Sequence, residues 1–84
     1  MSQPYFHEES STVRFWVPVE GALVGASISS ATLHYRFRPD AQGEDPLATY
    51  MAYSADIDAA VRRRVANGSI EPVMVREHDL RPGA

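Results

Sequence analysis

The chain has 84 residues, of which 44% are hydrophobic and 23% are charged, and its formal net charge is −3. This length fits one domain, the apolar content argues against disorder, and the mild negative charge argues against general electrostatic binding of nucleic acid. Cysteine is absent, which excludes disulfides and thiolate chemistry and fits a reducing compartment.

The first ten residues mix a proline, two aromatic residues and two acids without a regular period. We expect residues 1–10 to be a flexible segment or a short edge strand that includes Tyr5 and Phe6. The N-terminus shows no basic segment followed by an apolar run, and no stretch of 18 consecutive apolar residues occurs. We therefore expect no signal peptide, no membrane association and a cytoplasmic location.

Residues 12–19 and 22–28 predict a β-hairpin. Apolar residues alternate with others from Thr12 to Val19, and Glu20-Gly21 suits a two-residue turn. This turn brings four apolar pairs to one side of the hairpin: Val13 with Ile28, Phe15 with Ala26, Val17 with Val24, and Val19 with Ala22. The other side pairs Trp16 with Gly25 and Pro18 with Leu23.

The next segment, residues 29–38, fits two structures. Ser29 or Ser30 can cap a short helix in which Leu33 and Phe37 share a face. The same apolar residues, with Tyr35 between them, also alternate as in a third strand. Residues 39–44 predict a loop from their composition.

Residues 45–67 predict one long amphipathic helix. Asp45 suits the N-cap, Pro46 suits the first helical position, and Gly68 supplies the left-handed residue that commonly ends a helix. Between these ends, residues at three- and four-residue steps form one largely apolar stripe: Leu47, Tyr50, Ser54, Ile57, Val61 and Val65. Met51 and Tyr53 widen this stripe on opposite sides.

Residues 69–76 predict a closing strand, in which Val73 and Val75 face the helix and Met74 faces outward. Because Pro72 has no N–H, the strand begins there or lies at an edge. We expect this strand to run parallel to residues 22–28 and to lie beside residues 12–19. The fold class is α+β, a curled sheet of antiparallel type with the long helix across one face. The domain spans residues 11–80. The sequence becomes polar from Glu77 onward, and residues 81–84 form a polar tail outside the domain.

The order of these features resembles a small bacterial family, catalogued as domain of unknown function fourteen eighty-eight. The similarity covers about residues 11–80. It comprises Val13-Arg14-Phe15, a Gly-bearing turn, Ile28 to Leu33, Tyr50 or Tyr53 and Ile57 on the long helix, Pro72-Val73 and Asp79. Ala26 stands where the family often has a cysteine, and the helix end is unusually rich in arginine. The resemblance implies the fold and favours the capped short helix at residues 29–37, but it implies no reaction.

The polar residues form no catalytic or metal-binding pattern. His7, His34 and His78 lack the spacing of metal ligands. Asp56 and Asp58 point away from each other on a helix, so they cannot share a proton. The serines lie outside any nucleophile motif. We therefore expect no enzyme activity, no metal site and no cofactor.

Arg62, Arg63 and Arg64 form the one dense charge run, which we call the arginine triplet. Three cations in the last turns of a helix complement its negative end. Alternatively, the triplet is a candidate anion-binding site, which would make the chain a weak nucleic-acid-binding or regulatory domain. The observation that separates these interpretations is whether three further arginines converge with the triplet: Arg36, Arg38 and Arg76.

The sheet face away from the long helix is the second candidate site. The side chains expected there are Trp16, Pro18, Leu23 and Met74. They surround the small Gly25, and an apolar cluster anchored by Trp is typical of an interaction hot spot. This predicts a non-catalytic protein-interaction or self-association module, whose partner is another protein or a second copy. Alternatively, Tyr5 and Phe6 fold over this face and bury it within the monomer.

Overall fold

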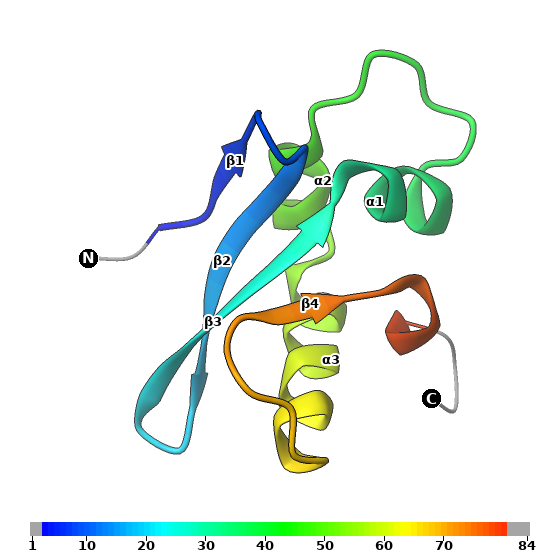
Figure 1. The fold of residues 1–84 in the computed structure, drawn as a ribbon. Helices are drawn as coiled ribbons and strands as arrows, with labels where there is room; N and C mark the ends of the chain where they lie inside the picture. Colours follow the sequence, from blue (N-terminus) through cyan, green and yellow to red (C-terminus); the bar gives the residue numbers. More distant parts are fainter. Residues whose placement is uncertain (1–2, 81–84) are drawn as a thin grey trace.

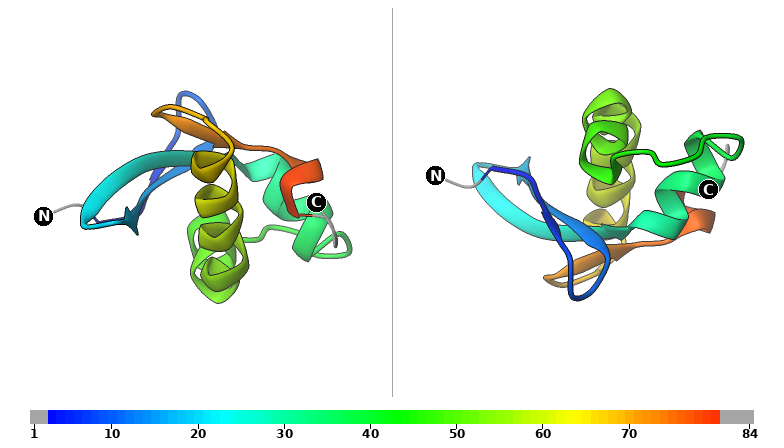
Figure 2. Two further views of the ribbon diagram at one scale, coloured as in Figure 1. Left: turned by 90° about the horizontal axis from the view of Figure 1, so that it is seen from below. Right: turned by 90° about the horizontal axis from the view of Figure 1, so that it is seen from above.

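The structure is a computed structural model, and it describes residues 3–80. The tail expected at residues 81–84 lies outside the described residues. The elements in chain order are β1 (Tyr5–His7), β2 (Thr12–Val19), β3 (Ala22–Ser29), α1 (Ser30–Phe37), α2 (Pro46–Ala52), α3 (Ser54–Ala66), β4 (Val73–Val75) and the 3-10 helix η1 (Glu77–Leu80). A sheet forms one layer, and α2 and α3 run across one of its faces (Figures 1 and 2).

The β2–β3 hairpin has the predicted register. Every expected pair is present, from Val13 opposite Ile28 to Val19 opposite Ala22. Glu20 and Gly21 have φ of 49° and 83°, as both residues of a type I′ turn require. The apolar side of the hairpin contributes five buried residues to the core, Val13, Phe15, Val17, Ala26 and Ile28, and β4 adds Val73 and Val75. The alternation of side chains along the two strands therefore specified their pairing.

The strand order differs from the prediction. The sheet has the order β1-β2-β3-β4, and β4 pairs with β3 in parallel, with Val73 opposite Ala26. The expected parallel direction is confirmed, but the position beside residues 12–19 is wrong. β1 occupies that position, antiparallel to β2 and with Phe6 opposite Val13. The sheet is therefore mixed rather than of antiparallel type, because the N-terminal segment filled the edge that we had assigned to the closing strand.

The predicted single helix over residues 45–67 is interrupted at Tyr53, which has φ −119° and ψ 21°. The hydroxyl of Ser54 donates to the carbonyl of Met51 at 3.4 Å, a contact that commonly bends helices. The ring of Tyr53 stacks on Phe37 with 4.4 Å between centroids. The break divides the helical layer, so that α2 contacts β1 and β2, whereas α3 contacts β2, β4 and η1.

The predicted ends of this helical region are confirmed. The Asp45 carboxylate accepts a hydrogen bond from the N–H of Leu47 at 3.0 Å. At the other end Gly68 has φ 98°, and the N–H of Ser69 donates to the carbonyl of Arg64 at 2.9 Å. This is the hydrogen bond expected where a left-handed glycine ends a helix.

The ambiguous residues 29–38 form a helix, as the family resemblance favoured. The hydroxyl of Ser29 accepts from the N–H of Thr32 at 3.0 Å, which makes Ser29 the N-cap of α1. Leu33 is buried in the core. Residues 39–44 form the predicted connection between α1 and α2.

The C-terminal part of the described chain is more ordered than a polar tail. β4 covers only residues 73–75, shorter than the predicted 69–76, with Val73 and Val75 buried and Met74 exposed as expected. Residues 77–80 then form η1, in which Asp79 and Leu80 are buried. The tail prediction is therefore wrong for residues 77–80, because hydrogen-bond donors from α1 and α3 hold this turn against the domain.

Candidate interaction face

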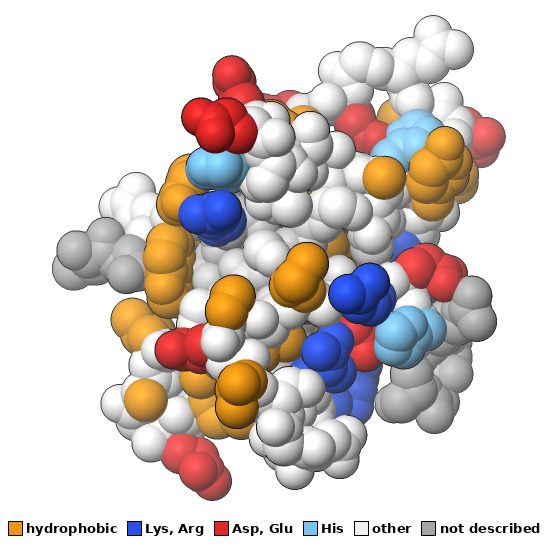
Figure 3. Space-filling model, in the orientation of Figure 1, with side chains coloured by type: hydrophobic (Ala, Val, Ile, Leu, Met, Phe, Trp, Pro, Cys, Tyr) orange, Lys and Arg blue, Asp and Glu red, His pale blue; other side chains and the backbone are white. Residues whose placement is uncertain are grey.

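The sheet face opposite α2 and α3, here called the outer face, carries the four residues of the predicted patch. Leu23 is 57% exposed and Met74 is 53% exposed, while Pro18 is exposed and Trp16 is partly exposed. In Figure 3, hydrophobic side chains lie along this side of the molecule among polar ones. No described helix packs on the outer face, since the helices contact the opposite side of the sheet (Figure 2).

The two N-terminal aromatic residues point to different faces. Tyr5 pairs with Arg14 and lies on the outer face, where its ring centroid is 6.2 Å from that of Trp16. Phe6 pairs with Val13 and packs against the core. Tyr5 therefore extends the aromatic surface beside Trp16, and Phe6 does not cover it.

A groove with a volume of about 540 Å³ crosses the outer face. Its lining includes Tyr5, Arg14, Trp16, Gly25, Glu71 and Met74. Gly25 lies between Trp16 and Glu71, and a Cβ atom built there would be 3.6 Å from Trp16 Nε1 and 3.9 Å from Glu71 Oε1. Glu71 Oε1 accepts a hydrogen bond from the N–H of Gly25 at 2.6 Å. The groove is therefore mainly aromatic and apolar, with one cation and one carboxylate on its walls.

Each member of the arginine triplet donates to a main-chain carbonyl in a different element. The contacts are Arg62 to Pro18 in β2 at 3.3 Å, Arg63 to Asp79 in η1 at 2.7 Å, and Arg64 to Met74 in β4 at 3.0 Å. The triplet therefore joins α3 to strands β2 and β4 and to η1, a role that sequence reasoning did not identify.

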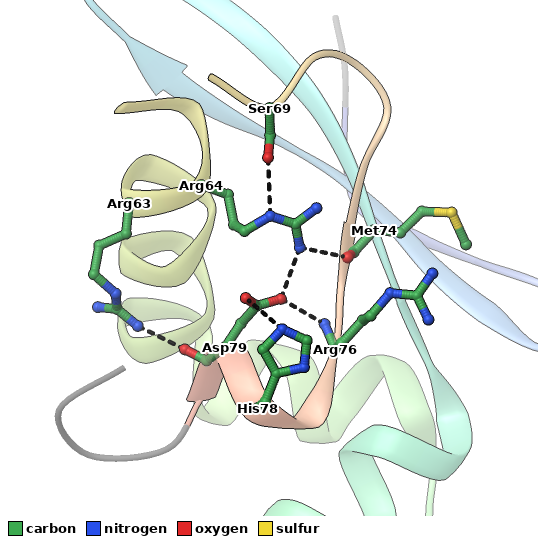
Figure 4. Close-up of polar contacts among 7 residues, drawn as sticks. All are labelled: Arg63, Arg64, Ser69, Met74, Arg76, His78 and Asp79. Carbon is green, nitrogen blue, oxygen red and sulfur yellow. Dashed lines mark hydrogen bonds and ion pairs between the residues drawn. The ribbon is translucent and has the colours of Figure 1, made fainter. Parts of the chain in front are cut away.

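Asp79 is the centre of this network (Figure 4). Its side chain is 9% exposed, and Oδ2 accepts from Arg64 at 2.8 Å and from the main-chain N–H of Arg76 at 2.9 Å. The carboxylate thus has a charged partner and a main-chain partner, as a buried charge requires. Ser69 Oγ accepts from Nε of Arg64 at 2.9 Å, which fixes the other side of the guanidinium.

The three further arginines behave differently from one another. Arg36 donates to the carbonyl of Leu80 at 2.9 Å and thus joins the network around η1. Arg76 contributes its main-chain N–H, while its guanidinium is directed away from Asp79 (Figure 4). Arg38 lies near Glu44 instead. The arginine side chains that converge around η1, those of Arg36, Arg63 and Arg64, therefore donate hydrogen bonds to groups of this chain.

A second polar cluster ties residues 39–44 to the helices. His34 Nδ1 lies 2.5 Å from Glu44 Oε1, and the hydroxyl of Thr49 donates to Glu44 Oε2 at 2.9 Å. Burial acts to raise the pKa of Glu44, but the hydrogen bonds from Thr49 and His34, with the charges of His34 and Arg38, outweigh it and lower that pKa. This contact was not predicted, because no sequence pattern links His34 to an acid ten positions away.

Residues 3–80 lack two further features. No group of three or more His, Cys, Asp or Glu side chains within this range is placed to hold a metal ion. None of the helices in the same range is long and apolar enough to cross a membrane.

Comparison with known proteins yields one match. Neither the curated proteins nor the solved structures contain a match to this chain. A family model, however, matches residues 1–74. This range begins before residues 11–80, on which the resemblance was based, and ends within β4. It includes every residue named above as lining the groove and stops short of η1. The chain therefore belongs to the family described as "Protein of unknown function (DUF1488)".

Proposed function

We propose that the chain is a non-catalytic protein-interaction module that binds through the outer face of its sheet. The observation that carries this proposal is the apolar groove of about 540 Å³ beside the exposed side chains of Leu23 and Met74. Exposed apolar surface of this kind is typical of protein-binding sites. Binding would bury these side chains, which the monomer leaves in water.

The composition of the groove supports a protein partner. Tyr5 and Trp16 supply large rigid rings, the side chains most often found at the centres of protein interfaces. Arg14 and Glu71 also line the groove, so charged groups border the apolar centre. An apolar centre with a polar border is the usual anatomy of such interfaces.

The positions of the polar groups support a non-catalytic role. The groove carboxylate, Glu71, is engaged with the N–H of Gly25. His34 belongs to α1 and is bonded to Glu44. His7 Nδ1 lies 2.7 Å from the hydroxyl of Ser10, a groove residue whose hydroxyl also contacts that of Thr12, so this histidine is engaged in a local turn network.

The alternative function, weak nucleic-acid binding or regulation through the arginine triplet, has less support. Arg62, Arg63 and Arg64 all donate to carbonyl groups of this chain, and the net charge is −3. We expect no shift of DNA or RNA in a salt-titrated gel assay at micromolar protein. Micromolar affinity with a steep dependence on salt would favour the alternative.

Two methionines provide a matched test of the proposal. Met74 on the outer face is 53% exposed and Met51 on α2 is 59% exposed. Tagged wild type, the variant Met74→Ser and the control Met51→Ser are compared for binding of purified partners, which are first identified by cross-linking and mass spectrometry. A second copy of the chain counts as a partner.

Met74→Ser should weaken binding about tenfold or more, as loss of a central contact does, and Met51→Ser should leave it unchanged. The double variant Trp16→Ala with Leu23→Ser provides an independent disruption of the same face. Equal affinity for all variants would overturn the proposal, as would the absence of both self-association and a purified binding partner.

A further inference from the structure

We propose that the partner presents an acidic segment to the outer face, with apolar side chains in the groove and carboxylates on Arg14 and Arg76. This inference rests on the proposed function, because it uses the same face, and it specifies the chemistry of the partner. It follows from the charged groups that the fold leaves without a partner of their own.

Arginine supplies all the Lys and Arg charge of this chain, because the sequence contains no lysine. Most of the described arginines are used within the molecule. The triplet and Arg36 donate to main-chain carbonyls, and Arg38 lies near Glu44. Among residues 3–80, by contrast, the guanidinium groups of Arg14 and Arg76 take part in no hydrogen bond or ion pair. Both residues are exposed, so both guanidinium groups are available to a partner.

Both unengaged guanidinium groups lie on the outer face. Arg14 is two residues before Trp16 on β2, and side chains two residues apart on a strand point to the same face. Arg76 follows Met74 by two residues, and Figure 4 shows its guanidinium on the same side of β4 as the side chain of Met74. The cations that the fold does not use therefore share the surface that carries the groove.

Hydroxyl groups lie on the surface between the two cations. A second hollow of about 300 Å³ adjoins the groove, and both are lined by Thr12, Ser27 and Met74. Arg14 lines the groove, and Arg76 lines the second hollow. The hydroxyl of Ser27 has no hydrogen bond among residues 3–80. Hydroxyl and guanidinium groups both donate to carboxylate oxygens, so this surface suits an acidic ligand.

The carboxylates of the same surface lie away from the sheet neighbours of Arg14. Its partners in register are Tyr5 on β1 and Ser27 on β3, and both are uncharged. Glu71 lies before β4 and is bonded to a main-chain N–H. Glu77 lies after β4, in η1. The position over Arg14 is therefore open to a carboxylate from outside the chain.

The spacing of the two arginines sets the size of the segment. Ser27 lies opposite both Arg14 and Met74, so Arg76 is two strands across from Arg14 and two residues further along. Strands about 4.8 Å apart, with a rise of about 3.3 Å per residue, place the two Cα atoms about 12 Å apart. Residues three positions apart in an extended segment are about 10 Å apart. Two acids at this spacing, with apolar residues between them, match the face.

Two tetrapeptides with blocked ends provide the test. One has the sequence glutamate, leucine, leucine, glutamate, and the other has glutamine in place of both acids. Each is titrated into the isotope-labelled chain, and the amide signals of the outer face are followed by NMR. We expect the acidic peptide to bind about tenfold more tightly than the neutral one, because its hydrogen bonds to arginine are charge-assisted. Added salt should weaken the acidic peptide selectively.

Arginine variants locate the contact. Arg14→Gln and Arg76→Gln should each reduce the preference for the acidic peptide and leave the affinity of the neutral peptide unchanged. Arg62→Gln is the matched control, because Arg62 is exposed on α3, on the other side of the sheet. The reversal Arg14→Glu should instead favour a tetrapeptide with lysine at both ends. A reversed preference would distinguish direct contact from a structural role of the arginine.

Four results would overturn the inference. The first two are no binding of the acidic peptide and equal affinity for the acidic and neutral peptides. The third is a preference that persists when Arg14 and Arg76 are both replaced by glutamine. The fourth is a dimer of the wild type that Met74→Ser dissociates, which would assign the face to a second copy. A purified partner weakened by Met74→Ser, but by neither arginine variant, would refute the acidic segment and leave the proposed function standing.

Discussion

The phenol of Tyr50 in α2 donates a hydrogen bond of 2.9 Å to the carboxylate of Asp58 in α3. The two residues lie on opposite sides of the break at Tyr53, so this bond connects the two helices through their side chains. Tyr50 is buried, and its ring centroid is 4.5 Å from that of Phe15. Burial raises the pKa of Asp58, against the hydrogen bond from Tyr50 and the charge of Arg62, which lower it.

The raised pKa predicts the effect of removing this charge. A carboxyl group whose pKa is higher in the folded state contributes stability below its ordinary pKa of 3.8, and this contribution is lost as the pH rises through the folded value. Asp58→Asn retains an acceptor for Tyr50 and removes the half-buried charge. We expect it to leave the free energy of unfolding at pH 7 unchanged or to raise it by up to about 1 kcal/mol.

Thermal melts between pH 4 and pH 7 provide the measurement for Asp58. The difference in melting temperature between Asp58→Asn and wild type should become smaller as the pH falls. Asp56→Asn is the control, because Asp56 is exposed on the same helix. A clear loss of stability at pH 7 in Asp58→Asn alone would show that the charge itself stabilises the fold.

Replacing single members of the arginine triplet by alanine should lower the free energy of unfolding by different amounts. Arg64→Ala removes the arginine partner of the buried Asp79 carboxylate, which then keeps only the longer 3.5 Å contact with the exposed His78, and we expect a loss of about 2–4 kcal/mol in the free energy of unfolding. Arg62→Ala removes one long hydrogen bond at an exposed site and should cost less than about 1 kcal/mol. Urea unfolding measures both. Equal losses would contradict the assignment of Asp79 as the centre of the network.

Glu44 should make the stability depend on acid pH. Its folded pKa is lowered, so its contribution is present above the ordinary pKa of 4.5 and is lost as the pH falls through the folded value. Glu44→Gln should therefore be less stable than wild type near neutrality, and the two should converge in acid. Glu9→Gln, at an exposed site, is the control for a general effect of charge. The prediction would be refuted if the stability of wild type and that of Glu44→Gln changed with pH in parallel.

The N-cap of α1 can be tested with two adjacent serines. Ser29→Ala removes the hydroxyl that accepts from Thr32 and should cost about 1 kcal/mol. Ser30→Ala should cost much less, because Ser30 is already within the helix. Denaturant midpoints of the two variants give the comparison, and a larger effect at Ser30 would contradict the observed cap.

Features that depend on neighbouring residues could be predicted from the sequence. The register from Val13 to Ile28 followed from alternation and a two-residue turn. The caps at Asp45 and Gly68 followed from the preferences of single residues. The outer face followed from the same register, since residues such as Trp16 must point away from the core if their neighbours point into it.

Features that depend on distant partners could not be predicted. The edge strand expected as one alternative for residues 1–10 is confirmed by β1, but a strand of three residues without a clear period did not indicate that its partner would be β2. The break at Tyr53 leaves the apolar stripe intact, because Ser54 stays in phase with it. The arginine triplet donates to main-chain carbonyls, which every residue has, so the sequence does not indicate which ones accept. Arg64 also binds the side chain of Asp79, which lies 15 positions away in the chain.

The main-chain contacts at the strand ends determine what kind of assembly is open to this chain. The carbonyl of Met74 accepts from Arg64, and that of Pro18, whose nitrogen has no hydrogen, accepts from the first arginine of the triplet. Beyond the end of β4, the N–H of Gly25 is bonded to Glu71. Groups that would otherwise template a further strand are thus engaged within the molecule. At these positions of β2 and β4, pairing with a strand of another chain is therefore discouraged.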